Sequence, residues 1–334
     1  MNANVRGLRP EETAFMIDLV VRAYAEYPER RIDADKVARA IAADPGYAPE
    51  FNRVVEVDGR LAGRLFIHDR SMSFDGGVLR VGAIGGVCVD PAYRRKGFCN
   101  LLLSDATVFM ESHGFDVSLL FGEPSVYGPS GWQTLVTSAM ATNLPLPAVA
   151  DVSVRRADLG RDGDMVRSLY QQFNSSLTGP FVRSPDYWNR WIGNRLKEQD
   201  SLRIWIVYRK TEPVGYFVDR AEAVGMVAEM AWSRQNAEAL PGMLSAIAQQ
   251  SGGARLHFPF YLPELRDAVL YGPNVLALAD LRRQGYDLQI AAHYSGLFKL
   301  INLKGESLSD VHDTAALLRL FRQRNYVFWG MDSF

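Results

Sequence analysis

The stretch from Leu79 to the helix after Gly97 constrains the fold more than any other part of this sequence. The apolar run Leu79–Val89 has the length of a buried strand, and Asp90-Pro91 ends it, because proline cannot donate to a ladder and favours extended geometry in the preceding residue. A basic turn, Arg94-Arg95-Lys96, then leads to Gly97. The apolar residues that follow recur at helical spacing: Phe98, Leu101, Leu102, Ala106 and Phe109. A strand that leads through a turn into a helix predicts an α/β fold with a mixed sheet.

The remainder of the first half fits the same class. Val5–Leu8 predicts a short strand, Arg53–Val57 and Leu61–Ile67 predict a hairpin around Asp58-Gly59, and Phe115–Phe121 predicts a further strand. A helix is expected to begin at Pro10. Its expected buried face holds Phe15, Leu19, Val20 and Ala23.

Composition excludes several function classes. The chain has 334 residues, 48% of them apolar and 22% charged, with a net charge of −1, so it resembles an ordinary globular protein of two domains. A non-specific nucleic-acid binder normally carries a basic excess, which is missing here. Apolar runs reach only about ten residues, too few to span a membrane. The N-terminus has no secretory apolar region, and only Cys88 and Cys99 occur, so we expect a cytoplasmic protein without disulfides.

The chain also contains an internal repeat. Asn143–Ala150 holds two prolines and reads as a linker. After it the pattern of the first half returns, with two strands joined at Glu212-Pro213. The matching segments are Val152–Arg155, Gly163–Phe173, Leu202–Tyr208, Val214–Val218 and Met226–Trp232. We therefore expect one unit over residues 1–145, a diverged copy over 151–303, and a tail over 304–334 whose helix Thr314–Phe321 and aromatic Tyr326–Trp329 dock on the body.

The basic turn predicts an anion site. The first N–H groups of a helix lack intrahelical acceptors and carry the positive end of the helix dipole. Gly97 lets the backbone approach a phosphate closely, and Arg94, Arg95 and Lys96 add positive charge. Together these features suit a pyrophosphate. The plainer alternative is a solvated turn in which Gly97 only starts the helix.

This segment resembles motif A of the Gcn5-related N-acetyltransferase superfamily, Arg/Gln-x-x-Gly-x-Gly/Ala after a strand, in the form Arg94-x-x-Gly97-x-Cys99. Cys99 departs from the family pattern. The resemblance implies that amides across Arg94–Cys99, Lys96 and Phe98 included, hold the pyrophosphate of acetyl-CoA. The edge of Val87, Cys88 and Val89 would pair with the pantetheine arm. The resemblance to this superfamily covers the first unit well, whereas in the second unit only the order of predicted strands and helices matches.

A second motif resembles the tandem sub-family called enhanced intracellular survival. In Gly122-Glu123-Pro124-Ser125-Val126-Tyr127 the resemblance implies that Gly122 and Glu123 border the cofactor and that Tyr127 protonates the departing thiolate. A phenol can do so at modest cost. The alternative is a turn tyrosine packed on Trp132.

The same sub-family uses its C-terminal carboxylate as general base, often that of a phenylalanine, and this chain ends at Phe334. An ammonium must lose a proton before its nitrogen attacks, and the carboxylate would accept this proton as the general base. The alternative is a tail packed for stability, with Glu123 or water as base. The sub-family's sterol-carrier-like third domain has no counterpart here.

The second unit lacks the Arg-x-x-Gly pattern after Met226–Trp232, and Glu238 would repel a phosphate, so we expect it to be degenerate and to shape the acceptor cleft. The five histidines show no metal-ligand spacing, which predicts no metal. The aromatic residues that could line an acceptor pocket or belong to the core are Tyr24, Tyr27, Phe181, Tyr187, Trp188 and Trp191.

The resulting hypothesis is an enzyme, an N-acetyltransferase that moves the acetyl group of acetyl-CoA to a primary amine of a small molecule such as an aminoglycoside or another natural product. We expect a backbone N–H near Val89 to stabilise the oxyanion. The alternatives are a protein or peptide N-acetyltransferase and a non-catalytic acyl-CoA-binding module. No nucleic-acid or membrane partner is expected, and a homo-oligomer is compatible with the sequence.

Overall fold

The computed structural model describes residues 3–30, 32–143, 149–198, 202–236, 239–270, 283, 285–302 and 311–332. Their strands are β1 (Ala3–Gly7), β2 (Asn52–Val57), β3 (Arg60–Phe74), β4 (Gly77–Val89), β5 (Val117–Leu120), β6 (Gln133–Thr142), β7 (Val152–Arg156), β8 (Leu202–Arg209), β9 (Glu212–Arg220), β10 (Ala223–Trp232), β11 (Leu256–Phe258) and β12 (Leu288–Leu300). The helices are α1 (Thr13–Tyr24), α2 (Ala34–Ala43), α3 (Phe98–Ser112), α4 (Pro124–Tyr127), α5 (Leu159–Asn174), α6 (Gly193–Glu198), α7 (Ala239–Gln250), α8 (Pro263–Leu270) and α10 (Thr314–Gln323).

All of these strands form one mixed sheet in the order β1-β2-β3-β4-β5-β12-β6-β11-β10-β9-β8-β7. The strands β1 to β4 are antiparallel and β5 joins β4 in parallel; β7 to β10 and β11 follow the same scheme. The prediction of an α/β mixed sheet is therefore confirmed. The strands β1–β5 at one end of the sheet therefore run in the same pattern of directions as β7–β11 at the other end.

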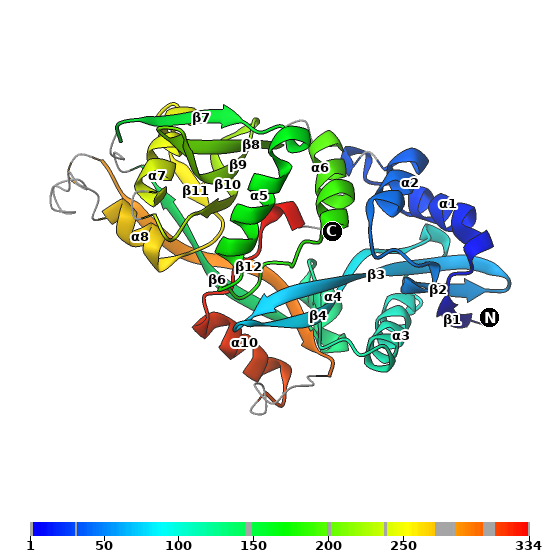
Figure 1. The fold of residues 1–334 in the computed structure, drawn as a ribbon. Coiled ribbons are helices and arrows are strands. Elements are labelled where there is room, and N and C mark those ends of the chain that lie inside the picture. Colours follow the sequence, from blue (N-terminus) through cyan, green and yellow to red (C-terminus); the bar gives the residue numbers. More distant parts are fainter. Residues whose placement is uncertain are drawn as a thin grey trace.

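The two halves exchange strands at the centre of the sheet. β12, from the second half, lies between β5 and β6, whereas β6, from the first half, pairs with β11 (Figure 1). The sheet is therefore continuous across the expected linker, whose residues 144–148 lie outside the described ranges. Each half completes its sheet with a strand of the other.

Helices cover both faces of the sheet around β2–β4 (Figure 1). Alternate residues of a strand point to opposite faces, so Val54 packs against Met16 of α1, whereas Val55 packs in the cluster of Leu102 and Phe109 of α3. A larger core spans β3–β6, the second half and the tail. In the tail, Tyr326, Val327 and Trp329 are buried.

Two local expectations were wrong. Phe15 is 69% exposed, because α1 turns Met16 toward the sheet instead. Glu212-Pro213 does not form the turn of the hairpin but begins β9. The turn lies between Arg209 and Glu212, where Lys210 has φ 53°.

Within the described ranges, no helix combines the length and the apolar character that crossing a membrane requires.

Candidate active site

A cavity of about 510 Å³ lies where β4 and β5 separate. The two strands pair in parallel only up to Ile84 and Leu120, after which β5 ends and β4 continues to Val89. A β-bulge at Gly86, with φ 56°, shifts the register of β4 against β3 and bends the strand away. The walls of the cavity are residues 84–89, residues 121–123 with Val126 and Tyr127, Arg94, and Ala23, Tyr24 and Tyr27 at the end of α1.

The turn before α3 has the geometry of an anion cradle. The Asp90 carboxylate accepts a hydrogen bond of 3.0 Å from the Ala92 N–H and so shapes the chain after β4. Arg95 and Gly97 both adopt positive φ, 61° and 80°, and Gly97 is the N-cap residue of α3. A side chain at Gly97 would meet no atom within 4 Å, so the left-handed backbone is what favours glycine there. The first N–H groups of α3 lack intrahelical acceptors, as at the start of any α-helix.

The three basic residues of this turn have different surroundings. Arg94 is tied to α1, because its guanidinium pairs with Glu26 and donates to the Ala23 carbonyl at 2.9 Å, with Val89 O at 3.3 Å. The hydrogen bond that Arg94 donates to the Glu26 carboxylate raises the pKa of Arg94. Arg95 and Lys96 are exposed, and the Lys96 ammonium lies 5.1 Å from the centre of the Tyr93 ring. Arg94 thus fixes the turn, and the accessible charge is that of Arg95 and Lys96.

The residues that were predicted to bind the cofactor fall into two groups. Val87, Cys88, Val89, Arg94, Gly122 and Glu123 line the cavity, whereas Arg95, Lys96, Gly97, Phe98 and Cys99 lie outside its lining, at the start of α3. The Cys88 side chain points to the α1 core, and burial raises the pKa of its thiol. Phe98, the first residue of α3, is buried in the core, and burial likewise raises the pKa of the half-buried Cys99.

Tyr127 stands at the wall of the cavity, at the end of α4. Its ring lies over Gly122, where an added Cβ would collide with it. The Tyr127 hydroxyl makes no hydrogen bond to a residue that the structure describes, and burial raises the pKa of the phenol to about 12. Tyr127 is therefore protonated at neutral pH, as a proton donor must be.

Tyr294 was not found by sequence reasoning, yet it fixes this wall. From β12, its hydroxyl donates to Gly122 O at 3.0 Å and accepts from Gly122 N at 3.1 Å. The Phe121 ring packs on Tyr294, with the ring centres 6.2 Å apart. Tyr294 and its partner Gly122 are 172 residues apart in the chain, so no local sequence pattern could have identified Tyr294.

A second cavity, of about 350 Å³, adjoins the first, and Tyr24 and Gly86 line both. It lies between α1, α2 and β3, and Trp191 from a π-helical turn of the second half, Tyr187–Ile192, closes it. Tyr24 donates from its hydroxyl to Val87 O at 3.3 Å, so this side chain links the two cavities to the bulge of β4. Of the six aromatic candidates, Tyr24, Tyr27 and Trp191 line these cavities, whereas Phe181, Tyr187 and Trp188 do not.

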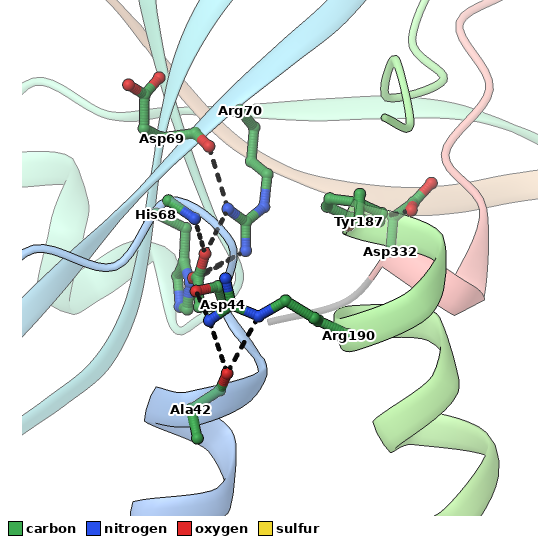
Figure 2. Close-up of polar contacts among 9 residues, drawn as sticks. Ala42, Asp44, His68, Asp69, Arg70, Tyr187, Arg190 and Asp332 are labelled. Atoms are coloured by element: carbon green, nitrogen blue, oxygen red, sulfur yellow. Dashed lines mark hydrogen bonds and ion pairs between the residues drawn. The ribbon is translucent and has the colours of Figure 1, made fainter. Parts of the chain in front are cut away.

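A buried ion cluster holds the wall of the second cavity (Figure 2). Asp44, after α2, accepts from His68 Nδ1 at 2.5 Å and from both terminal nitrogens of Arg70 at 2.9 and 2.8 Å. Burial would raise the pKa of Asp44, but the hydrogen bonds from His68 and Arg70 outweigh it and lower that pKa. Burial lowers the pKa of His68 to about 4, so its ring is neutral at pH 7.

The same cluster joins the two halves. Arg190 donates to the carbonyls of Ala42, at 2.7 Å, and Asp44, at 3.1 Å (Figure 2). The Arg70 guanidinium lies 4.9 Å from the centre of the Trp191 ring. Nothing in the sequence pattern linked these residues. No group of metal-ligating side chains is found in the described part of the chain.

The predicted general base, Phe334, lies outside the described residues. The tail is described up to Asp332, which Arg183 holds at 2.8 Å and Tyr187 at 3.1 Å, inside the second half. Arg183 also binds Glu229 on β10, and these ionic side chains are fully buried. Tyr187 belongs to the same π-helical turn as Trp191, so the tail is anchored behind the wall of the second cavity.

Comparison with solved structures shows the fold. A probable N-acyltransferase from Enterococcus faecalis V583 superposes with a TM-score of 0.65 at 16% identity, over 91% of this chain and 74% of that one. A GCN5-related N-acetyltransferase from Anabaena variabilis gives 0.65 at 15% identity, over 90% and 73%. Eis1 from Mycobacterium abscessus gives 0.62 at 14% identity, over 90% and 74%.

A search of curated proteins gave no match. A family model described as an acetyltransferase (GNAT) domain matches residues 4–135, which include the first cavity and the turn before α3. The chain thus carries an acetyltransferase (GNAT) domain over residues 4–135, and its enzyme class is that of an N-acetyltransferase that uses acetyl-CoA.

Proposed function

We propose that this enzyme acetylates a primary amine of a small molecule, with acetyl-CoA in the first cavity and the amine in the second. The cavity between β4 and β5 carries the proposal, because one wall offers an unpaired strand edge and the other offers Tyr127. The pantetheine arm runs along Val87–Val89, and the pyrophosphate lies on the amides from Arg94 to Cys99.

The direction of the backbone N–H groups supports a place for the oxyanion. The Asp90 N–H donates to Ala62 O on β3 at 2.9 Å. Successive N–H groups of a strand point to opposite edges, so the Val89 N–H points toward the cavity. This donor stabilises the negative charge on the carbonyl oxygen of the attacked thioester.

The reaction conserves atoms and charge as follows. The ammonium first loses a proton to the Phe334 carboxylate, and the free amine then forms a bond to the acetyl carbon. The carbon–sulfur bond breaks, Tyr127 gives its proton to the leaving thiolate, and the second proton on the acylated nitrogen passes to the Tyr127 phenolate. A phenol of pKa about 12 donates to a free thiolate of ordinary pKa at a cost of about 5 kcal/mol. Burial in the same cavity also raises the pKa of the thiol, which reduces that cost.

We further propose that residues 151–303 are a degenerate copy of residues 1–145, related by the shared scheme of strand directions. The place that matches the coenzyme gap is filled in the second half. There Ala228–Trp232 of β10 are all buried, and a Cβ added to Gly330 of the tail would lie 3.7 Å from Ala228. Trp329 packs on Phe260 with ring centres 4.8 Å apart. Glu238 lies outside the described residues. This filling supports a structural role, with only the first unit binding coenzyme.

Calorimetry of the purified chain with coenzyme A, followed by a thiol-release assay with acetyl-CoA and a panel of amines, tests the proposal. We expect one bound coenzyme per chain and an acetylated amine detected by mass. Binding without any acetylated amine would instead favour a non-catalytic acyl-CoA-binding module.

A further inference from the structure

Arg64 lies in the wall of the second cavity. It stands on β3 opposite Cys88 of β4, and its side chain reaches the bulge, where a Cβ added to Gly86 would lie 2.6 Å from Arg64 Nη2. Since Gly86 also lines the first cavity, the guanidinium lies beside the junction of the two cavities. If acetyl-CoA occupies the first cavity, as proposed above, an acceptor in the second cavity meets Arg64.

This guanidinium has no anionic partner among the described residues. Arg64 is 8% exposed, its Nε is buried without a hydrogen bond, and its one hydrogen bond, from Nη1, goes to the Met16 sulfur at 3.5 Å. The other buried arginines differ: Arg70 pairs with Asp44 at 2.8 Å, and Arg183 pairs with two carboxylates.

An unpaired buried cation is unfavourable, because the interior solvates charge poorly. Burial lowers the pKa of Arg64, yet a guanidinium stays protonated in proteins. The charge therefore attracts any anion that enters the cavity. The planar fork of arginine matches a carboxylate with two parallel hydrogen bonds.

The other residues around the second cavity fit the same ligand. Its lining contains no aspartate or glutamate among the described residues, and it includes Lys36 and the Trp191 indole, whose N–H is buried without a partner. The apolar residues of its wall are Val20, Ile32, Val37, Ala40, Ile41 and Phe66. A polycation such as an aminoglycoside would find no countercharge there.

We propose that the acceptor is a small amine that also carries a carboxylate, and that Arg64 binds this carboxylate while the amine faces the thioester beyond Gly86. The bonds made and broken are those of the proposed acetyl transfer, and the carboxylate takes no part in them. Arg64 is thus a specificity-determining residue. The inference rests on the proposed function.

Matched acceptors test it: α-, β- and longer-chain amino acids, each compared with its own carboxamide, with spermidine as polycation. For the preferred chain length we expect kcat/KM for the carboxylate to exceed that for the carboxamide by about 30- to 1,000-fold. Arg64→Gln should remove this preference by lowering kcat/KM for the carboxylate while leaving the carboxamide within about threefold. Arg60→Gln, at an exposed arginine of the same strand, should leave the preference unchanged.

A preference that survives in Arg64→Gln, or no preference at any chain length, would overturn the inference. Failure of the proposed function has a different signature, since no amine would then be acetylated. In that event, calorimetry of the protein loaded with coenzyme A decides: tighter binding of the amino acid than of its amide, lost in Arg64→Gln, supports the carboxylate site, and equal binding refutes it. Arg64→Met should keep or raise the melting temperature, whereas a purely structural arginine would lower it.

Discussion

A single hydroxyl group, that of Tyr294, makes hydrogen bonds to both the N–H and the carbonyl of Gly122. Tyr294 belongs to the second half of the chain, whereas Gly122 precedes the helix that bears Tyr127. The exchanged strand β12 thus sets the position of the proton donor proposed for the first half. The contact gives the second half a role in the acetyl transfer although no coenzyme is proposed to bind there.

Tyr294→Phe removes both hydrogen bonds and keeps the ring. We expect kcat to fall about 3- to 10-fold, because Gly122 and the Tyr127 ring above it lose their fixed position. Steady-state kinetics measures the effect, with Tyr261→Phe, a tyrosine that accepts from Arg266, as control. An unchanged kcat would show that Gly122 is held well enough by its neighbours.

Tyr127→Phe removes the proposed acid. We expect kcat to fall by roughly 10²- to 10³-fold while the Kd for coenzyme A stays the same. Because the pKa of Tyr127 is raised to about 12, wild-type kcat should show no loss from this group up to about pH 11. A kcat within twofold of wild type would remove Tyr127 from the mechanism.

Arg95→Glu reverses an exposed charge beside the proposed pyrophosphate site. We expect the Kd for coenzyme A to rise about 10-fold at low salt, and less at high salt, since screening weakens exposed charges. Calorimetry at two ionic strengths measures it, with Arg156→Glu on β7 as the matched control. Equal affinities in the two variants would place the pyrophosphate elsewhere.

The His68 cluster predicts a pH dependence of stability. Unfolded histidine titrates near pH 6.5, but folded His68 has a pKa of about 4, so between these values the unfolded chain binds the extra proton. The free energy of unfolding should therefore fall by up to about 3 kcal/mol as the pH drops from 6.5 to 4. Asp44 adds no pH dependence within this window. Its lowered pKa stabilises the fold fully above the pKa of an unfolded carboxyl, and this stabilisation is lost only at lower pH.

Urea unfolding between pH 4.5 and 7.5 measures this dependence. His68→Gln should flatten it, whereas His113→Gln, at an exposed histidine, should leave it as in the wild type. The charged groups that act on His68 are Asp44, Arg70 and Arg64, and all of them stay in both variants. An equally steep curve in His68→Gln would assign the dependence to other groups.

Asp332→Ala tests the anchor of the tail. It leaves the buried Arg183 with Glu229 alone, so we expect a loss of about 3 kcal/mol or more of unfolding free energy. Asp313→Ala, which removes the N-cap of α10, should cost only about 1 kcal/mol. Similar losses in chemical denaturation would mean that the buried ion cluster is weaker than its geometry suggests.

Sequence reasoning predicted the elements that depend on local signals. The strand Leu79–Val89, its stop at Pro91 and the helix after Gly97 follow from periodicity and backbone chemistry, and the structure has all of them. Val89 and Tyr127, which two separate motifs singled out, both line the first cavity. These predictions rest on residues that are close in the chain or belong to a shared motif.

What was missed depends on contacts between distant segments. Arg64, His68 and Asp44 belong to no recognisable sequence motif. They come together at the second cavity only where α2, β3 and the π-helical turn pack in the folded chain. Phe15 was misplaced for a related reason, because helical spacing alone does not decide which of two adjacent apolar residues faces the sheet. The exchange of β6 and β12 has no local signature at all.

That exchange also dictates an order of events during synthesis. The ribosome releases β5 long before residues 288–300, so the growing chain exposes an open strand edge until those residues have been made. The first cavity, whose wall relies on Tyr294, consequently cannot take its final shape before β12 leaves the ribosome.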